Sequence, residues 1–339
     1  MRPFDLLLPS FIPAVVGKEM NIYLDNLITG RAGNYEFEVY CEIGRLQDER
    51  WTVVPEAGGD YALTILLYSL NGEKLSSAES TVRVAEQSAG RGVVNKALFI
   101  GDSLTANGAF TGELLRLTEA DPLELALAGT QGASPNVHEG RSGWKVESHY
   151  EGGESTFQFD GTFDFVKYMH ANGFGGLTHV GITLGINDVF LCLDDDEVQR
   201  IMDREMPMLE AMVRGIKQYD AGIMIGIMLN IPPSREQHGF GLLYGTKQSR
   251  RRYKRNIFLW NRELTNRFGS REAEGIALVP INVNLDTANN MPLVWEAVNS
   301  RNSKQILRKC DDVHPAVEGY YQLADVIYYW LKTLAADSK

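Results

Sequence analysis

The chain has 339 residues, of which 44% are hydrophobic and 23% charged, and its formal net charge is −11 at pH 7. This length and ordinary composition predict a globular protein with room for two domains. The acidic balance excludes nucleic acid as the main partner, because phosphate binding requires a basic surface. No apolar run reaches the ~18 residues that a membrane span needs, so no membrane-spanning segment is expected.

The N-terminal segment, residues 1–21, contains an apolar stretch that Asp5, Pro9 and Pro13 interrupt. It has no basic region ahead of a long apolar core, so it does not fit a secretory signal peptide. We therefore expect a cytoplasmic location, or secretion if a signal was removed before residue 1.

The spacing of cysteines and histidines gives no sign of a metal site or a disulfide framework. Cys41, Cys192 and Cys310 are far apart and form no CxxC pair, and no two histidines have HxH or HxxxH spacing. Structural metal sites and disulfide-rich domains need such clusters. We expect no metal and no other cofactor.

Residues 1–92 are patterned as short strands. Residues 35–44 alternate apolar side chains with Glu36, Glu38 and Glu42, which is typical of a strand with one buried and one wet face. Residues 60–75 carry a second strand into the hairpin signal Asn71-Gly72, and residues 80–86 form a third. We interpret this segment as a small all-β sandwich domain, immunoglobulin-like or jelly-roll-like, that ends in a polar, glycine-containing linker at residues 86–92.

Residues 93–339, the predicted second domain, alternate apolar strands with helices. The strands are expected at residues 95–101, 123–129, 177–185, 221–229 and 275–281, and the helices at residues 106–120, 164–173, 195–220, 247–269 and 314–334. Such alternation indicates an α/β fold with a parallel sheet buried on both faces. Ligands in these folds bind beyond the carboxyl ends of the strands.

The helix expected at residues 247–269 begins with the basic run KQSRRRYKR. Contact with an anionic surface is one interpretation of this run. However, Tyr253, Ile257, Trp260 and Leu264 recur at helical spacing behind it. We therefore expect an amphipathic helix whose charged side chains face water.

Reactive side chains follow several of the predicted strands. Ser103 comes two residues after Gly101, Asn187 follows the third strand, and Asp311 and His314 lie between the fifth strand and the last helix. A serine hydroxyl needs a base within hydrogen-bond reach, the pKa of histidine lies near neutrality, and a carboxylate fixes the histidine tautomer. The chain thus carries candidates for nucleophilic catalysis of acyl transfer.

The blocks GDSL at residues 101–104, GIND at 185–188 and DDVH at 311–314 resemble those of the SGNH/GDSL hydrolase family, and HEGRSGW at 138–144 is similar to its glycine-bearing block, especially in carbohydrate acetylesterases. The resemblance covers residues 94–334 and implies a flavodoxin-like three-layer α/β/α domain with five parallel strands. It implies that Ser103 is the nucleophile and that Asp311 and His314 are the acid and the base. It also implies an oxyanion hole made by the Ser103 N–H, the Gly143 N–H and the Asn187 side chain.

These assignments have alternatives. Ser103 is in a position where a serine also serves as a helix cap. Gly140 competes with Gly143 for the oxyanion hole, and we prefer Gly143 because a small residue followed by glycine matches the family pattern. Asp312 competes with Asp311 as the partner of the histidine, and the family pattern selects Asp311.

Four neighbouring residues complete the predicted site. We expect Asp102, His138 and Trp144 to line the substrate pocket, with Trp144 either as a platform for a sugar or as a packing residue. Asp188 is interpreted as a structural residue that binds loop amides.

The sequence therefore predicts a serine esterase that removes O-acetyl groups from a carbohydrate, with a small-molecule or carbohydrate ester as its partner. Two alternatives stay open. One is a lipid or thioester acyl hydrolase of the same family, and the other is a catalytically silent glycan-binding protein. The pattern predicts no particular oligomeric state.

Overall fold

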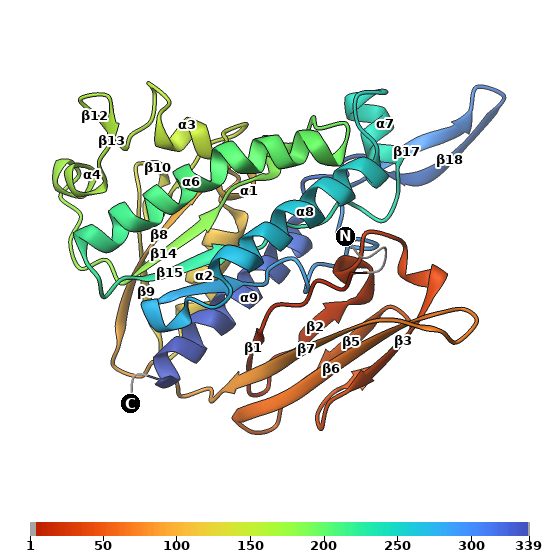
Figure 1. Ribbon diagram of the computed structural model, residues 1–339, viewed down its shortest axis with the longest axis horizontal. Coiled ribbons are helices and arrows are strands. Elements are labelled where there is room, and N and C mark those ends of the chain that lie inside the picture. Colours follow the sequence, from red (N-terminus) through yellow and green to blue (C-terminus); the bar gives the residue numbers. More distant parts are fainter. Residues whose placement is uncertain (1–4, 338–339) are drawn as a thin grey trace.

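The computed structural model describes residues 5–337 and has a sheet-rich N-terminal region, red to orange in Figure 1, beside a larger α/β region. Residues 1–4, the start of the segment tested above for a signal sequence, lie outside the described residues. Within residues 5–337, no helix combines the length and the apolar character needed to cross a bilayer.

Two small sheets make up the N-terminal region. One has the strand order β1-β7-β6-β3 and the other β2-β5-β4. Their bounds are β1 (Phe11–Val15), β2 (Met20–Tyr23), β3 (Tyr35–Tyr40), β4 (Arg45–Leu46), β5 (Arg50–Val53), β6 (Gly59–Ser69) and β7 (Lys74–Ala85), with the 3-10 helices η1 (Leu24–Leu27) and η2 (Ala32–Asn34) between strands. The predicted alternation is present in β3, and the predicted turn at Asn71-Gly72 joins β6 to β7, with Gly72 at a positive φ of 82° that favours glycine.

A parallel sheet forms the centre of the α/β region. Its strands are β8 (Val94–Gly101), β9 (Glu124–Ala128), β11 (Asn136–Gly140), β14 (His179–Thr183), β15 (Met224–Met228) and β16 (Ile276–Val279). The order β9-β8-β14-β15-β16 is the 2-1-3-4-5 order of flavodoxin-like folds, and all these pairs are parallel. The predicted fold is thus confirmed, with its five parallel strands in this order. β11 is a further strand, parallel to the end of β8, that was not predicted.

Part of the HEGRSGW block at residues 138–144 is a strand, because β11 continues through Gly140. β11 pairs with the end of β8, where Gly140 lies opposite Gly101, and the short β10 (Gln131–Ala133) runs antiparallel to it.

Helices cover both faces of the sheet. Figure 1 shows α6 and α8 on the near face, and α2 and α9, which pack against each other, on the far face. The bounds are α1 (Ser103–Ala106), α2 (Ala109–Thr118), α3 (Val146–Tyr150), α4 (Phe165–Ala171), α5 (Ile186–Val189), α6 (Asp195–Tyr219), α7 (His238–Tyr244), α8 (Arg250–Phe268), η3 (Glu272–Glu274) and α9 (Val317–Asp337). The sheet therefore has an apolar layer on each side, as its apolar strands require.

The basic run at the start of α8 corrects one expectation. Tyr253 and Trp260 are buried as predicted, but Arg250 and Lys254 do not face water. Both bind Asp25 Oδ2, Arg250 through Nη2 at 2.9 Å and Lys254 through Nζ at 3.0 Å. The pairing offsets the cost of burying these charges, and it joins α8 to the N-terminal region.

Residues 282–285, which follow β16, also bind the N-terminal region. Asn26 Nδ2 donates to the carbonyl oxygens of Asn282 and Leu285, both at 2.8 Å, and the N–H of Tyr23 donates to Val283 O at 2.9 Å. One cluster of buried hydrophobic side chains includes residues of both N-terminal sheets, the central sheet and α9. The two regions are therefore packed against each other across a continuous core.

An antiparallel hairpin, β17 (Leu293–Asn299) and β18 (Asn302–Lys309), projects from the body near α7 (Figure 1). Neither this hairpin between β16 and Asp311 nor α7 was predicted from the sequence. A second, very short hairpin is formed by β12 (Gln158–Phe159) and β13 (Thr162–Phe163).

Candidate active site

Ser103 is placed at the carboxyl end of β8 by a tight turn. A Cβ on Gly101 would lie 2.1 Å from Thr105 Oγ1, so only glycine lets the strand end this close to α1. The Asp102 carboxylate caps α1 by accepting the Leu104 N–H at 2.9 Å, and Ser103 is the first residue of the helix. The turn leaves the Ser103 hydroxyl half-buried at the end of the sheet.

Ser103, His314 and Asp311 form a continuous chain of hydrogen bonds. Ser103 Oγ lies 2.8 Å from His314 Nε2, and His314 Nδ1 lies 2.8 Å from Asp311 Oδ2. The serine and the histidine are 211 positions apart in the sequence. Asp311 Oδ1 also accepts the N–H groups of Val313 and His314, at 2.8 and 3.0 Å, so the turn itself orients the carboxylate.

This geometry shifts the pKa values of both ionisable members. The hydrogen bond with Asp311 raises the pKa of His314 above its ordinary value, although burial acts in the opposite direction. Burial raises the pKa of Asp311, but the hydrogen bonds from the His314 side chain and from two backbone amides outweigh it, so the net shift is downward. Asp311 therefore stays ionised at the pH where His314 changes its charge.

The two neighbouring aspartates are bound elsewhere. Asp312 is buried and its Oδ2 accepts the Phe240 N–H at 2.7 Å, so it belongs to the contact with α7. Asp102 is fully buried, and burial raises its pKa to about 7. Of the three carboxylates, Asp311 alone is hydrogen-bonded to His314 among the described residues.

Gly143 and Asn187 line a common groove with a volume of about 660 Å³. Gly143 has a positive φ of 80°, and its α-carbon faces open space. Asn187, in α5, donates from Nδ2 to Trp144 O at 3.0 Å, and Arg141 N–H donates to Gly101 O at 3.0 Å. These two bonds hold the loop that carries Gly143 beside the end of β8.

Gly140 lies in a different environment from Gly143. It is buried in β11, and its N–H already donates to His138 Nδ1 at 3.1 Å. A Cβ at this position would lie 2.3 Å from the Ala106 nitrogen. Gly140 is therefore required for packing against α1 and has no free N–H.

The three residues expected to line the pocket differ in their exposure to solvent. Asp102 and His138 are buried and line none of the cavities described here. Trp144 is half-buried and lines a second hollow that also includes Gly143. The Arg141 guanidinium lies over its ring, 4.8 Å from the centroid, and the His149 ring packs against it at 4.8 Å between centroids.

Two buried carboxylates hold the start of α3, which follows the Gly143 loop. Asp188 Oδ1 accepts the Val146 N–H at 3.0 Å, in agreement with its predicted role, and Glu205 Oε2 accepts the Glu147 N–H at 2.9 Å. Burial, and then the charge of Glu205, raises the pKa of Asp188 to about 8. The role of Glu205 could not be predicted from the sequence, because this residue lies inside the long helix α6 and no motif marks it.

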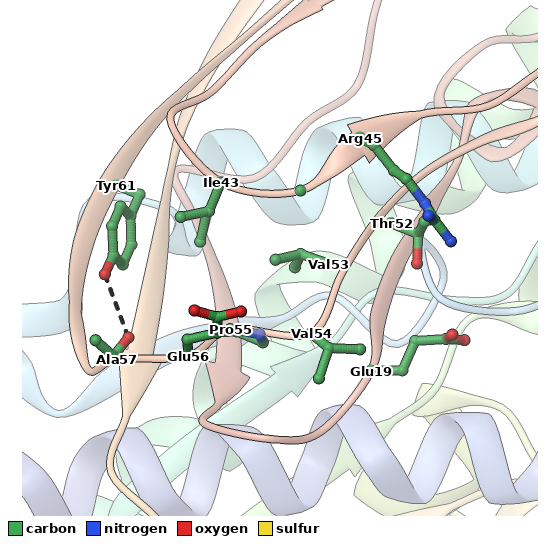
Figure 2. Close-up of a pocket in the computed structure, with 11 residues that line it drawn as sticks. Glu19, Ile43, Arg45, Thr52, Val53, Val54, Pro55, Glu56, Ala57 and Tyr61 are labelled. Atoms are coloured by element: carbon green, nitrogen blue, oxygen red, sulfur yellow. Dashed lines mark hydrogen bonds between the residues drawn. The ribbon is translucent and has the colours of Figure 1, made fainter.

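A separate cavity of about 660 Å³ lies within the N-terminal sheets (Figure 2). Tyr61, whose hydroxyl donates to Ala57 O at 3.3 Å, stands at one end, and Glu19 and Arg45 stand at the other. No predicted site residue lines this cavity. Within residues 5–337, no group of three or more His, Cys, Asp or Glu side chains is arranged to hold a metal ion.

The similarity to known proteins covers the α/β region, which carries Ser103, Asp311 and His314. Residues 98–327, more than half of the chain, match the family model described as GDSL-like Lipase/Acylhydrolase. No curated protein matches the sequence.

Several solved structures are similar to the protein. A putative platelet activating factor from Streptococcus pneumonia is 15% identical, with 71% of this chain and 85% of that chain covered and a TM-score of 0.42. A possible lipase from Chitinophaga pinensis DSM 2588 is 12% identical, with 70% and 98% covered and a TM-score of 0.41. A carbohydrate acetylesterase from Sinorhizobium meliloti is 14% identical, with 71% and 99% covered and a TM-score of 0.39.

Proposed function

Because the chain belongs to the GDSL-like lipase/acylhydrolase family, and so to hydrolases that act on esters, we propose that it cleaves carboxylic esters with Ser103 as nucleophile, His314 as base and Asp311 as the partner of the base. The observation that carries the proposal is the unbroken chain of hydrogen bonds from Ser103 Oγ through the imidazole to Asp311 Oδ2, with 2.8 Å at each step. The same site supports both the attack and the release of the alcohol.

In the first half of the reaction, Ser103 Oγ attacks the ester carbonyl carbon while its proton moves to His314 Nε2. Asp311 keeps the Nδ1 proton in place and stabilises the imidazolium that forms. The C–O bond to the alcohol then breaks, and the alcohol oxygen takes the proton from Nε2. In the second half, water attacks the acyl-enzyme by the same steps and releases the acid and the free serine.

The oxyanion of the tetrahedral intermediate needs donors that are already in place. We assign this role to the N–H groups of Ser103 and Gly143 and to Asn187 Nδ2. Asn187 donates one N–H to Trp144 O, which leaves its second N–H for the oxyanion. The N–H of Gly140 is engaged by His138, which supports Gly143 as the glycine donor. One such donor contributes about 2.7–4 kcal/mol to the transition state.

For the substrate, we propose an O-acetyl group on a carbohydrate, on the basis of the HEGRSGW block at residues 138–144. Trp144 is half-buried beside Gly143, and the part of its indole that Arg141 and His149 leave uncovered is the proposed platform for a sugar ring. A longer acyl chain is the second candidate, since Phe190, Leu191 and Ile201 give the groove at Gly143 an apolar wall.

Initial rates on 4-nitrophenyl acetate, butyrate and octanoate test the proposal. Turnover by the native protein should vanish in Ser103→Ala and persist in Ser142→Ala, which removes an exposed serine hydroxyl from the neighbouring loop. A steep fall from acetate to octanoate would support the acetylesterase, whereas a rise would support the longer acyl chain. Equal turnover by Ser103→Ala and the native protein would contradict the assignment of Ser103 as nucleophile. If the native protein hydrolyses none of these esters but binds a glycan, the result would favour the catalytically silent glycan-binding protein.

A further inference from the structure

The groove at the proposed oxyanion hole has an uneven distribution of charge. Its lining includes Gly143 and Asn187 of the proposed oxyanion hole, the apolar side chains of Phe190 and Ile201, and Lys145. Lys145 is half-buried, and no carboxylate of the described residues lies within 4.0 Å of its amine. In a chain with a net charge of −11, this cation shares a groove with Gly143 and Asn187 and has no carboxylate partner among the described residues.

A second cation, Arg200, lines the same groove. It is 69% exposed, and its one carboxylate neighbour, Glu197, lies at 4.0 Å, the limit of an ion pair. Glu197 is engaged by the chain itself, because its Oε2 accepts the Leu193 N–H at 2.6 Å. The other carboxyl of the groove, Asp188, is buried, and its pKa is raised to about 8, so it is largely uncharged at neutral pH. The groove therefore holds two cations against one carboxylate.

Resting on the proposed function, we propose that this groove binds an anionic group of the ester substrate, and that Lys145 is the residue that selects for it. The substrate class is a carboxylate-bearing ester. Its reacting carbonyl lies at Ser103, a short apolar portion lies along Phe190 and Ile201, and its carboxylate lies at Lys145 with Arg200 nearby. A half-buried ammonium makes stronger hydrogen bonds to a carboxylate than an exposed one, and part of its desolvation has already occurred on folding.

The carboxylate can belong to either half of the ester, and two pairs of substrates separate these sources. For the alcohol half, 4-acetoxybenzoate is compared with phenyl acetate. For the acyl half, mono-(4-nitrophenyl) glutarate is compared with 4-nitrophenyl pentanoate. The readout is the ratio of kcat/KM for the anionic ester to kcat/KM for its neutral partner, so that effects common to both substrates cancel.

The ratio is measured in the native protein, Lys145→Met, Lys145→Arg and a control, Lys167→Met, whose lysine is exposed on α4 and pairs with Asp160 outside the groove. We expect Lys145→Met to lower the ratio about tenfold for one of the two pairs, in line with a hydrogen bond to a charged group. Lys145→Arg should restore most of it, and Lys167→Met should leave it unchanged. Added salt should lower the native ratio and have less effect on the ratio of Lys145→Met.

The inference is overturned if Lys145→Met and Lys167→Met give the same ratios in both pairs. A second readout separates this result from failure of the proposed function. In Ser103→Ala, where the ester cannot be cleaved through that serine, binding of 4-acetoxybenzoate and of glutarate is followed by calorimetry with and without Lys145→Met. If the native protein shows no turnover but binding depends on Lys145, the proposed esterase mechanism is rejected and the anion site in the groove is retained. If binding does not depend on Lys145, only the proposed anion site is rejected.

Discussion

Replacing Asp311 with asparagine tests the part of the site that sets the state of the histidine. Asp311 Oδ2 faces His314 Nδ1 at 2.8 Å, while Oδ1 accepts the backbone N–H groups of Val313 and His314. In Asp311→Asn, the amide oxygen keeps the two backbone bonds, so the amide nitrogen must face Nδ1, to which it can only donate. The imidazole then carries its proton on Nε2, where it can no longer accept the proton of Ser103.

The size of the effect follows from what the carboxylate contributes. Loss of a tautomer-fixing carboxylate costs about 10⁴-fold in kcat in a serine protease, which corresponds to ~5 kcal/mol. The Asp311 side chain is 20% exposed, so water screens its interaction with His314 only in part. We therefore expect kcat to fall by ~10³–10⁴-fold, with little change in stability, because the backbone hydrogen bonds survive.

Asp312→Asn is the matched control for this prediction. Asp312 is the adjacent carboxylate, is buried, and binds the Phe240 N–H rather than His314. An asparagine oxygen can still accept that bond, so the rate should fall less than tenfold. Initial rates on 4-nitrophenyl acetate and thermal melts of both variants make the comparison. The reasoning would be refuted by a loss in Asp312→Asn as large as that in Asp311→Asn, or by an Asp311→Asn enzyme within tenfold of the native rate.

The activity kcat/KM should fall on the acid side of its pH profile with a midpoint above pH ~6.5, because the base must be neutral to accept a proton and the hydrogen bond to its carboxylate partner raises the pKa of His314. A midpoint below pH ~6.5 in steady-state rates would contradict this prediction. Gly140→Ala should unfold at a much lower denaturant concentration than Gly143→Ala, because the added Cβ at position 140 would lie 2.3 Å from a backbone nitrogen. Gly143 faces open space, so its alanine variant has only the ~1–2 kcal/mol cost of a left-handed φ. Equal unfolding midpoints of the two variants would argue against the close packing at Gly140. Asn187→Ala is expected to lower kcat by ~10²–10³-fold with KM little changed, and a loss below tenfold would exclude its amide from the oxyanion hole.

The parts of the fold that could be predicted are those with a complete local pattern. β8 is apolar from Ala97 to Ile100 and ends on Gly101, and α8 has a continuous apolar stripe that includes Tyr253 and Trp260. The types and order of the candidate site residues were also visible, because Ser103, Asn187 and the Asp311–His314 pair each follow a strand. Carboxyl ends of parallel strands meet at one edge, so the order along the chain was enough to bring Ser103 and Asn187 together. The Asp311–His314 pair reaches the same edge only after the unpredicted hairpin of β17 and β18.

What could not be predicted depends on contacts between distant segments. Arg250 and Lys254 appeared to belong to a water-facing run because their partner, Asp25, is 225 positions away from Arg250. The hairpin at residues 293–309 escaped notice because its strands are largely exposed, so their apolar residues do not define one buried face. The choice between Gly140 and Gly143 needed the hydrogen bond to His138, which no spacing reveals.

The hydrogen bonds between the N-terminal region and residues 282–285 have a consequence for engineering of the chain. Asn26 and Tyr23 hold this segment from one side, and a few residues later Asn290 O accepts the Ala316 N–H, two positions beyond His314. A replacement for the N-terminal region would have to place hydrogen-bond donors where Asn26 and Tyr23 now provide them. Without those donors, the carbonyls of Asn282 and Leu285 would be buried and unpaired, which would cost ~1–3 kcal/mol of stability each. Exchanging the N-terminal region between homologues would therefore also alter the support of the segment that leads to His314. Chimeras should exchange the N-terminal region and residues 282–285 as one unit.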